Sequence, residues 1–174
     1  MTDEQGATET ADEEQPTEAQ KRENVVRLAF GGDEKRYQEF CDAVATGVPE
    51  NTTVILRGSS VTGRRWKDGA EFDADGPGTS DLDLTLVGDE AVKLFKLSGF
   101  YVPGVHSRPL SEHAPGIAPD LVPLREHLME MVGRPVNIQA SLDAVMYLRG
   151  DILGQPYHVL IERVAAGEPA DSQL

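Results

Sequence analysis

Two aspartates separated by one residue, Asp81 and Asp83, have the spacing best suited to chemistry in this sequence. They lie in the run SDLDLTLV, where polar and apolar residues alternate, as in a half-buried β-strand. Successive side chains of a strand point to opposite faces, so both carboxylates would stand on one face, about 6–7 Å apart. Like charges held this close raise each other's pKa. The pair therefore predicts a site for a divalent cation, Mg²⁺.

Gly58 and Ser59 form a second chemical element, directly after the apolar and β-branched run TTVIL at residues 52–56. Such a run is typical of a strand that is covered on both faces. Glycine lets the backbone approach an anion closely, and the amides of a helix that begins near Ser60 would point at phosphate oxygens. The turn therefore predicts a phosphate-binding loop.

Basic residues are concentrated near this turn in an otherwise acidic sequence: Arg57, Arg64, Arg65 and Lys67. Guanidinium groups pair well with phosphate oxygens, so we predict that Arg64 and Arg65 bind phosphate together with the Gly-Ser turn. For each single residue, a solvated loop charge is the alternative. Trp66 has two interpretations, since its ring could stack on a base or form part of the core.

The turn and the aspartate pair together resemble the DNA polymerase β-like nucleotidyltransferase superfamily. Its signature is a strand, Gly-Ser, a short helix and an Asp-apolar-Asp motif on the next strand, with a third carboxylate on a later strand. Gly58-Ser59 and Asp81-Leu82-Asp83 match these motifs. The resemblance implies that Asp81 and Asp83 are catalytic and hold Mg²⁺, and that Ser59 contacts the terminal phosphates of a nucleoside triphosphate such as ATP. It further implies transfer of a nucleoside monophosphate to an acceptor hydroxyl, with release of pyrophosphate.

Two features depart from the family pattern. The 21 residues between the Gly-Ser turn and the aspartate pair are a longer gap than in the family, so residues 66–78 look like an insertion. The expected strand at 136–140 carries Asn137 and Gln139 where the family has its third carboxylate. An amide orients a hydroxyl but does not readily take its proton. Substitutes from elsewhere in the chain would be Glu112, Asp120 or Asp143.

These departures leave two functions open, a nucleotidyltransferase and a related fold that binds a nucleotide or a protein partner without transfer. Two other motifs are discounted. The stretch GSSVTGRR from Gly58 lacks the Lys and the Ser or Thr that a P-loop requires. The motif DLDLT at 81–85 also looks like that of haloacid-dehalogenase-type phosphatases, but a Gly-Thr-Ser stretch precedes it where those enzymes have an apolar strand.

The remaining pattern predicts a small mixed sheet flanked by helices, an α/β or α+β domain. We expect helices at 33–47, 89–94, 120–132 and 142–148, the last capped by Ser141, and strands at 52–56, 81–87, 136–140 and 158–162. Glycine and proline are frequent in residues 99–118, for which we predict only an extended piece at 101–102.

Composition divides the chain into three parts. Residues 1–22 contain no large aliphatic or aromatic side chain after Met1, so we predict a disordered acidic tail there. The nucleotidyltransferase-like domain would span residues 23–166, and residues 167–174 would form a loose C-terminal tail. Residues 1–20 hold seven acidic and no basic side chains, which leaves a net charge of −7 out of −14 for the remainder.

That moderate charge argues against a broad nucleic-acid-binding face. The acceptor stays open among a small molecule, a protein side chain and an RNA end. Cys41 is the single cysteine, which excludes a disulfide framework and a cysteine metal site within this chain. The four histidines lack metal-ligand spacing and are interpreted as structural or surface residues. The start MTDEQGATET lacks a signal-peptide pattern and no long apolar run follows, so we expect a cytoplasmic protein without membrane insertion.

Overall fold

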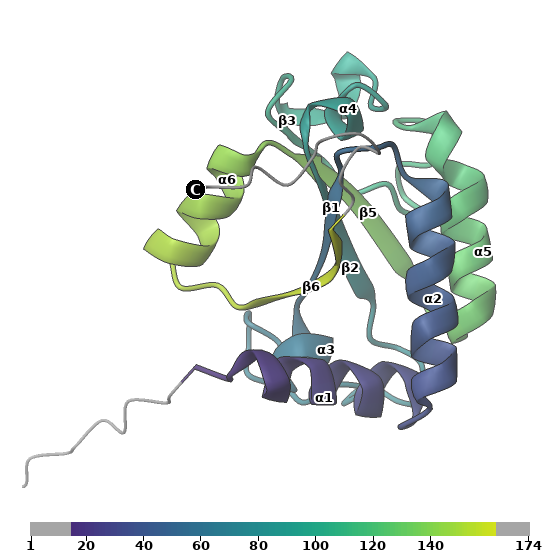
Figure 1. Ribbon diagram of the computed structural model, residues 1–174, viewed down its shortest axis with the longest axis vertical. Helices are drawn as coiled ribbons and strands as arrows, with labels where there is room; N and C mark the ends of the chain where they lie inside the picture. Colours follow the sequence, from purple (N-terminus) through teal and green to yellow (C-terminus); the bar gives the residue numbers. More distant parts are fainter. Residues whose placement is uncertain (1–14, 163–174) are drawn as a thin grey trace, which may run out of the picture.

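The computed structural model describes residues 15–162, which form one mixed β-sheet with helices on both faces (Figure 1). The sheet has the strand order β3-β4-β5-β2-β1-β6. β2 pairs in parallel with β5 and antiparallel with β1, and β1 also pairs antiparallel with β6. The strands are β1 (Thr53–Arg57), β2 (Leu82–Val87), β3 (Phe100–Val102), β4 (His106–Ser107), β5 (Val136–Ser141) and β6 (Tyr157–Glu162). The predicted α+β class is confirmed.

Helices α2 and α5 pack side by side on one face of the sheet, and α6 lies on the opposite face (Figure 1). The helices are α1 (Glu18–Phe30), α2 (Glu34–Gly47), α3 (Ser59–Thr62), α4 (Asp89–Val92), α5 (Val122–Val132) and α6 (Asp143–Tyr147). A π-helical turn (Leu148–Ile152) continues α6, and 3₁₀ turns lie at Leu97–Gly99 and Pro119–Leu121. Among residues 15–162, no helix has the length and hydropathy that a membrane span requires.

Apolar and polar side chains alternate along β2, so one face of the strand packs into the core and the other is largely polar. Leu82, Leu84 and Leu86 are at most 1% exposed and belong to the main core with Phe40 of α2 and Leu128 of α5. Burial of each such side chain contributes roughly 1.5–3 kcal/mol relative to exposure. The leucine face of β2, predicted from the sequence, is therefore the surface against which α2 and α5 pack.

The opposite face of β2 carries Asp83, Thr85 and Val87, because side chains alternate along a strand. Only a small apolar cluster covers this face, in which Val87 and Ile55 pack with Met146 of α6. The rest of the face bears polar side chains from β1, β2 and β5. Helix α6 and its π-helical extension thus cover a polar surface with few apolar contacts.

Helix α1 corrects the predicted boundary of the acidic tail. We expected disorder to residue 22 and no helix before residue 33, but a helix spans Glu18–Phe30. Thr17 accepts a hydrogen bond from the Gln20 amide and donates its own amide to the Gln20 side chain. This capping box stabilises a first turn that buries few side chains, while Val25 and Phe30 anchor the rest of the helix in the core. Predicted tail residues 1–14 and 167–174 lie outside the described residues.

Two further expectations about local structure are wrong. The expected extended piece at 101–102 is part of β3, but residues 99–118 also contain a second strand, β4, which was not expected. Ser141 does not cap the following helix, because it is the last residue of β5 and its hydroxyl is hydrogen-bonded to His106 Nδ1. The cap position belongs to Leu142, whose side chain makes no capping hydrogen bond. Ser141 therefore joins β5 to β4.

The long segment between α3 and β2 is fixed to the sheet by one ion pair. Arg134, just before β5, donates to both carboxylate oxygens of Asp73, at 2.8 and 3.1 Å. Asp73 also accepts from the amides of Gly78 and Ser80, and the Arg134 guanidinium lies 4.5 Å from the Phe72 ring centre. The Arg134 hydrogen bonds, helped by those amides, lower the pKa of Asp73 to about 2. The predicted insertion is thus anchored at its centre.

Asp73→Ala is expected to lower the free energy of unfolding by about 2–4 kcal/mol, because it leaves the nearly buried Arg134 unpaired. Urea unfolding at pH 7 measures this change, with Asp75→Ala as the control. Asp75 is 68% exposed and pairs with Arg65 at the surface, so its replacement should cost far less. The folded pKa of Asp73 is depressed, so this stabilisation is present above the ordinary value of 3.8 and is lost as pH falls toward about 2. Equal losses for both variants would contradict the anchoring role.

Candidate functional site

The predicted aspartate pair meets an amide from the neighbouring strand. Asp83 of β2 is in register with Asn137 of the parallel strand β5. The Asn137 side-chain amide donates to Asp83 Oδ1 at 3.1 Å and to Asp81 Oδ2 at 2.9 Å. Both carboxylates therefore converge on one point at the polar face of the sheet.

The two carboxylates differ in environment. Asp81 is exposed, whereas Asp83 is half-buried. Burial is the main cause that raises the pKa of Asp83, and the charge of Asp81 adds to it, while the Asn137 hydrogen bond and the charge of Arg57 act in the opposite direction. A carboxylate in this position gains from a nearby cation, since the cation offsets both the burial and the like charge.

The donor set fits a Mg²⁺ ion that shares its coordination with a substrate. Within residues 15–162, no group of three or more His, Cys, Asp or Glu side chains is placed to hold a metal. Mg²⁺ commonly takes only one or two protein carboxylates and fills its other positions with water and phosphate oxygens. Asp81 and Asp83 meet that requirement, and a half-turn of the Asn137 amide would present its oxygen as a further ligand.

The Gly-Ser turn lies directly against the pair. Gly58 has φ +87° and precedes α3, and a Cβ at this position would lie 3.3 Å from Asp83 Oδ2. The backbone conformation therefore favours glycine, and a Cβ here would also push the Asp83 carboxylate by a few tenths of an ångström. Ser59 is 8% exposed and is not among the residues that line the cavity beside Asp83. The structure thus brings Gly58, but not the Ser59 side chain, to this cavity.

Gly58→Ala is expected to weaken Mg²⁺-dependent nucleotide binding at least tenfold, because the added methyl group displaces the Asp83 carboxylate. Gly63→Ala is the matched control, since Gly63 has φ +81° but nothing within 4 Å of an added Cβ. Both changes should lower the free energy of unfolding through backbone strain, and Gly58→Ala should do so more, because the ψ of −159° at Gly58 places it in a region essentially confined to glycine, whereas Gly63 has ψ −11°. Calorimetric titration and urea unfolding separate the two effects. Equal binding by both variants would show that the contact with Asp83 is unimportant.

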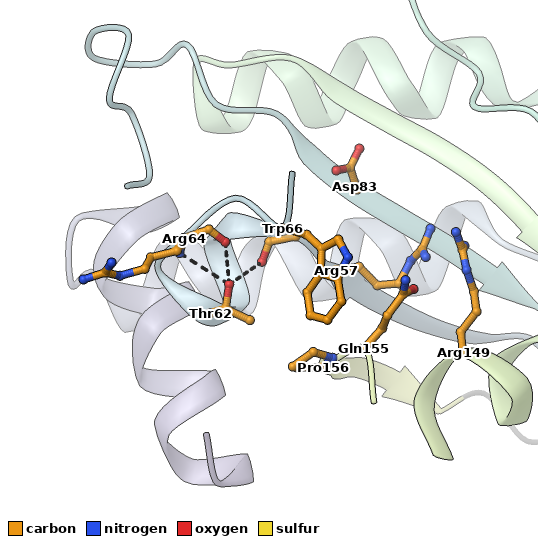
Figure 2. A pocket seen from close by; sticks show the side chains of 9 residues that line it. Arg57, Thr62, Arg64, Trp66, Asp83, Arg149, Gln155 and Pro156 are labelled. Carbon is orange, nitrogen blue, oxygen red and sulfur yellow. Dashed lines mark hydrogen bonds between the residues drawn. The ribbon is translucent and has the colours of Figure 1, made fainter. Parts of the chain in front are cut away.

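Neither predicted phosphate-binding arginine is directed at the aspartates. Arg65 makes ion pairs with Asp68 at 3.2 Å and Asp75 at 2.7 Å, so its charge is offset within its own loop. Arg64 is exposed, and Figure 2 shows its guanidinium pointing away from Asp83. A change of rotamer would be required before Arg64 could contact a ligand at the pair.

A cavity of about 240 Å³ opens beside Asp83 and is shown in Figure 2. It is lined by Arg57, Gly58, Thr62, Arg64, Trp66, Asp83, Arg149, Gln155 and Pro156. Trp66 is 72% exposed, so the interpretation as partial core is wrong. An exposed indole at the rim of a cavity offers a flat surface on which a base could stack.

Arg149 is the main site residue that the sequence did not reveal. It comes from the π-helical turn after α6 and lines the same cavity as Arg57 of β1. Arg57 Nη2 donates to Gln139 Oε1 at 2.8 Å. Burial and then the charge of Arg149 lower the pKa of Arg57 to about 10, and burial also lowers the pKa of Arg149. No sequence motif links these arginines, because only the tertiary fold brings them together.

Comparison with known proteins adds no further assignment, since no protein-family model, curated protein or solved structure matches this chain. The site comprises two carboxylates and an amide at one point, a glycine turn against one carboxylate, and two arginines in the adjoining cavity.

Proposed function

We propose that this protein is a Mg²⁺-dependent nucleotidyltransferase that moves a nucleoside monophosphate from a nucleoside triphosphate to an acceptor hydroxyl. The observation that carries the proposal is the convergence of Asp81 and Asp83 on Asn137, at 2.9 and 3.1 Å, with Gly58 against Asp83. This arrangement combines metal-binding carboxylates with a backbone turn that a phosphate can approach. It is also the arrangement implied by the resemblance to the polymerase β-like superfamily.

In the proposed reaction, the acceptor oxygen forms a bond to the α-phosphorus while the bond to the bridging oxygen of the departing pyrophosphate breaks. Bound Mg²⁺ would offset negative charge on the phosphate oxygens. Asp81 and Asp83 would hold the ion, and the Gly58 turn would admit the phosphates. Trp66 offers a surface for the base. The amide of Asn137 would orient the reacting groups but would not take the acceptor proton, which therefore passes to solvent.

A second candidate function is nucleotide binding without transfer. The observation that favours it is again Asn137, because an amide replaces the carboxylate that would act as general base. Among residues 15–162, no other acidic side chain joins the pair to make a group of three. A protein of this kind would bind a metal-nucleotide complex and communicate its presence to a partner.

Calorimetric titration of the full chain with each nucleoside triphosphate, in Mg²⁺ and then in excess EDTA, tests the shared part of both functions. Transfer is then assayed as pyrophosphate release and as movement of an α-phosphate label to three acceptor classes: small hydroxyl compounds, protein side chains and RNA ends. Binding with transfer supports the enzyme, and binding without transfer to any class supports the second function. Absence of Mg²⁺-dependent binding for every nucleotide would overturn both.

A further inference from the structure

Two arginines on the polar face of the sheet, Arg57 and Arg149, line the same cavity as Asp83 and have buried nitrogens without hydrogen-bond partners in the described part of the chain. Arg57 Nε and Arg149 Nη1 are buried, and neither has a hydrogen-bond partner among the described residues. The only hydrogen bond found for the Arg57 guanidinium within residues 15–162 goes to the neutral Gln139. The Asp83 carboxylate partly offsets the charge of Arg57, but burial and the charge of Arg149 still lower the pKa of Arg57, so a further anion between the two arginines would be favourable.

The position of the pair relative to the aspartates follows from the strand register. Asp83 pairs with Asn137, and the next residues on the same face, Thr85 and Gln139, also pair with each other. The Arg57 side chain reaches Gln139, which places its guanidinium one step further along the strands than the aspartate pair. Asp83 therefore lies between Asp81 and the arginines.

The two arginines open into a cavity. Thr85 on the same face is fully buried and does not line it, although its hydroxyl also has no hydrogen-bond partner among residues 15–162. Arg57 and Arg149 both line the cavity of about 240 Å³ that opens toward Trp66, and Figure 2 shows their guanidinium groups close to each other on the side of the cavity away from Arg64. The space accommodates a small anionic group.

We propose that Arg57 and Arg149 form a subsite for a phosphate group of the acceptor, in the same cavity as Gly58 and Asp83 and next to the position proposed for the nucleotide triphosphate. The assignment of this phosphate to an acceptor rests on the proposed function, whereas the anion site itself does not. A phosphate monoester carries a charge of about −1.5 to −2 at pH 7, which matches two guanidinium groups better than a single carboxylate does. Its tetrahedral oxygens also suit the planar donor forks of arginine. The acceptor class is therefore a phosphorylated hydroxyl compound.

Phosphate binding can be followed through Trp66, which is the single tryptophan of the chain and lines the same cavity. The full-length protein is titrated with inorganic phosphate in EDTA at constant ionic strength, with fluorescence and the thermal midpoint as readouts. The variants are Arg149→Met, which removes the charge, and Arg149→Lys, which keeps the charge without the donor fork. The control is Arg108→Gln, which removes an exposed guanidinium that stacks on Tyr101. Circular dichroism checks that each variant is folded.

Wild type and Arg108→Gln should bind phosphate without metal, and phosphate should raise their thermal midpoints. Arg149→Met should weaken binding on the order of tenfold to a hundredfold, as for loss of a charge-assisted hydrogen bond, and Arg149→Lys should fall between. The midpoint of ligand-free Arg149→Met should be no lower than that of wild type, because one of two repelling charges is gone. No phosphate binding by wild type, or equal binding by wild type and Arg149→Met, would overturn the subsite.

The titration is repeated with a saturating nucleoside triphosphate and Mg²⁺. Unchanged phosphate affinity supports a separate acceptor subsite, whereas competition would assign these arginines to the nucleotide's own phosphates and overturn the acceptor assignment. The two proposals fail independently. Loss of metal-dependent nucleotide binding with phosphate binding intact counts against the proposed function, and the reverse result counts against this subsite.

Discussion

Asp83→Asn, alone or together with Asp81→Asn, should abolish Mg²⁺-dependent nucleotide binding and at the same time raise the stability of the ligand-free protein. The loss of affinity should exceed the roughly 10–100-fold that removal of an outer-shell partner of a metal site produces, because a direct ligand is removed. Stability should rise because Asp83 is a half-buried carboxylate next to a like charge. Calorimetric titration and thermal unfolding at pH 7 measure the two effects.

The direction of the stability change follows from the raised pKa of Asp83. A group with a higher pKa in the folded state binds its proton more tightly there, so its contribution favours folding at low pH and is lost as pH rises through the folded pKa. At pH 7 the charged Asp83 carboxylate therefore lowers the stability of the folded protein, whereas an uncharged amide at this position would not. For the same reason, metal-dependent nucleotide binding by wild type should weaken on acidification at a pH above the ordinary carboxyl value of 3.8.

Asp89→Asn is the matched control, because Asp89 is an exposed aspartate in the short helix that follows β2. Its replacement should leave nucleotide affinity unchanged. If the double variant of Asp81 and Asp83 binds a metal-nucleotide complex as wild type does, these residues are not part of the site. Lower rather than higher stability of Asp83→Asn would show that the carboxylate makes a structural contact that outweighs its burial.

Asn137→Asp should have the second largest effect. It should lower the stability of the protein without metal, and Mg²⁺ should reverse most of that loss. The new carboxylate would face Asp81 and Asp83 at the hydrogen-bond distances that the amide now occupies. In EDTA, repulsion of one to two pKa units would lower the free energy of unfolding by about 1.4–2.7 kcal/mol. Saturating Mg²⁺ should restore most of that stability, because the ion would then meet three carboxylates. Urea unfolding in EDTA and in Mg²⁺ measures the difference.

Gln139→Glu is a control on the same strand and face, for which the expected change in stability in EDTA has the opposite sign. Its new carboxylate would meet Arg57, which already donates to the Gln139 side chain at 2.8 Å, so stability should rise in EDTA without any metal. If Asn137 occupies the position of a missing general base, Asn137→Asp should also accelerate transfer by about 10²–10⁴-fold. If Mg²⁺ changed the stability of Asn137→Asp and of wild type equally, position 137 would not be part of the metal site.

The part of the site that could be predicted from the sequence is the part encoded by local alternation. A two-residue period fixes which side chains of β2 share a face, so the placement of Asp81 and Asp83 opposite Leu82 and Leu84 follows directly. The strand at 136–140 could be predicted in the same way, but its pairing with β2, which brings Asn137 to Asp83, could not. The order and type of the main helices and strands were predictable for the same reason.

The rest depends on tertiary contacts. Arg64 and Arg65 stand near the turn in sequence, but Arg65 is held by Asp68 and Asp75, and the α3 turn directs Arg64 outward. Arg149 enters the site only because the segment after α6 folds back over the sheet. Helix α1 was not predicted, and its first turn is stabilised by capping rather than by burial. Proximity in sequence is a poor guide to proximity in space for long flexible side chains.

The wide sequence separation of the site contacts has a consequence for how the chain folds. Asp81 and Asn137 are 56 residues apart, and Arg57 and Gln139 are 82 apart, so neither contact survives in an unfolded chain. Contacts of high sequence separation form slowly because closing the intervening loops loses chain entropy. Ligands of this site therefore bind only the native state. They should slow unfolding while leaving the early steps of refolding unchanged.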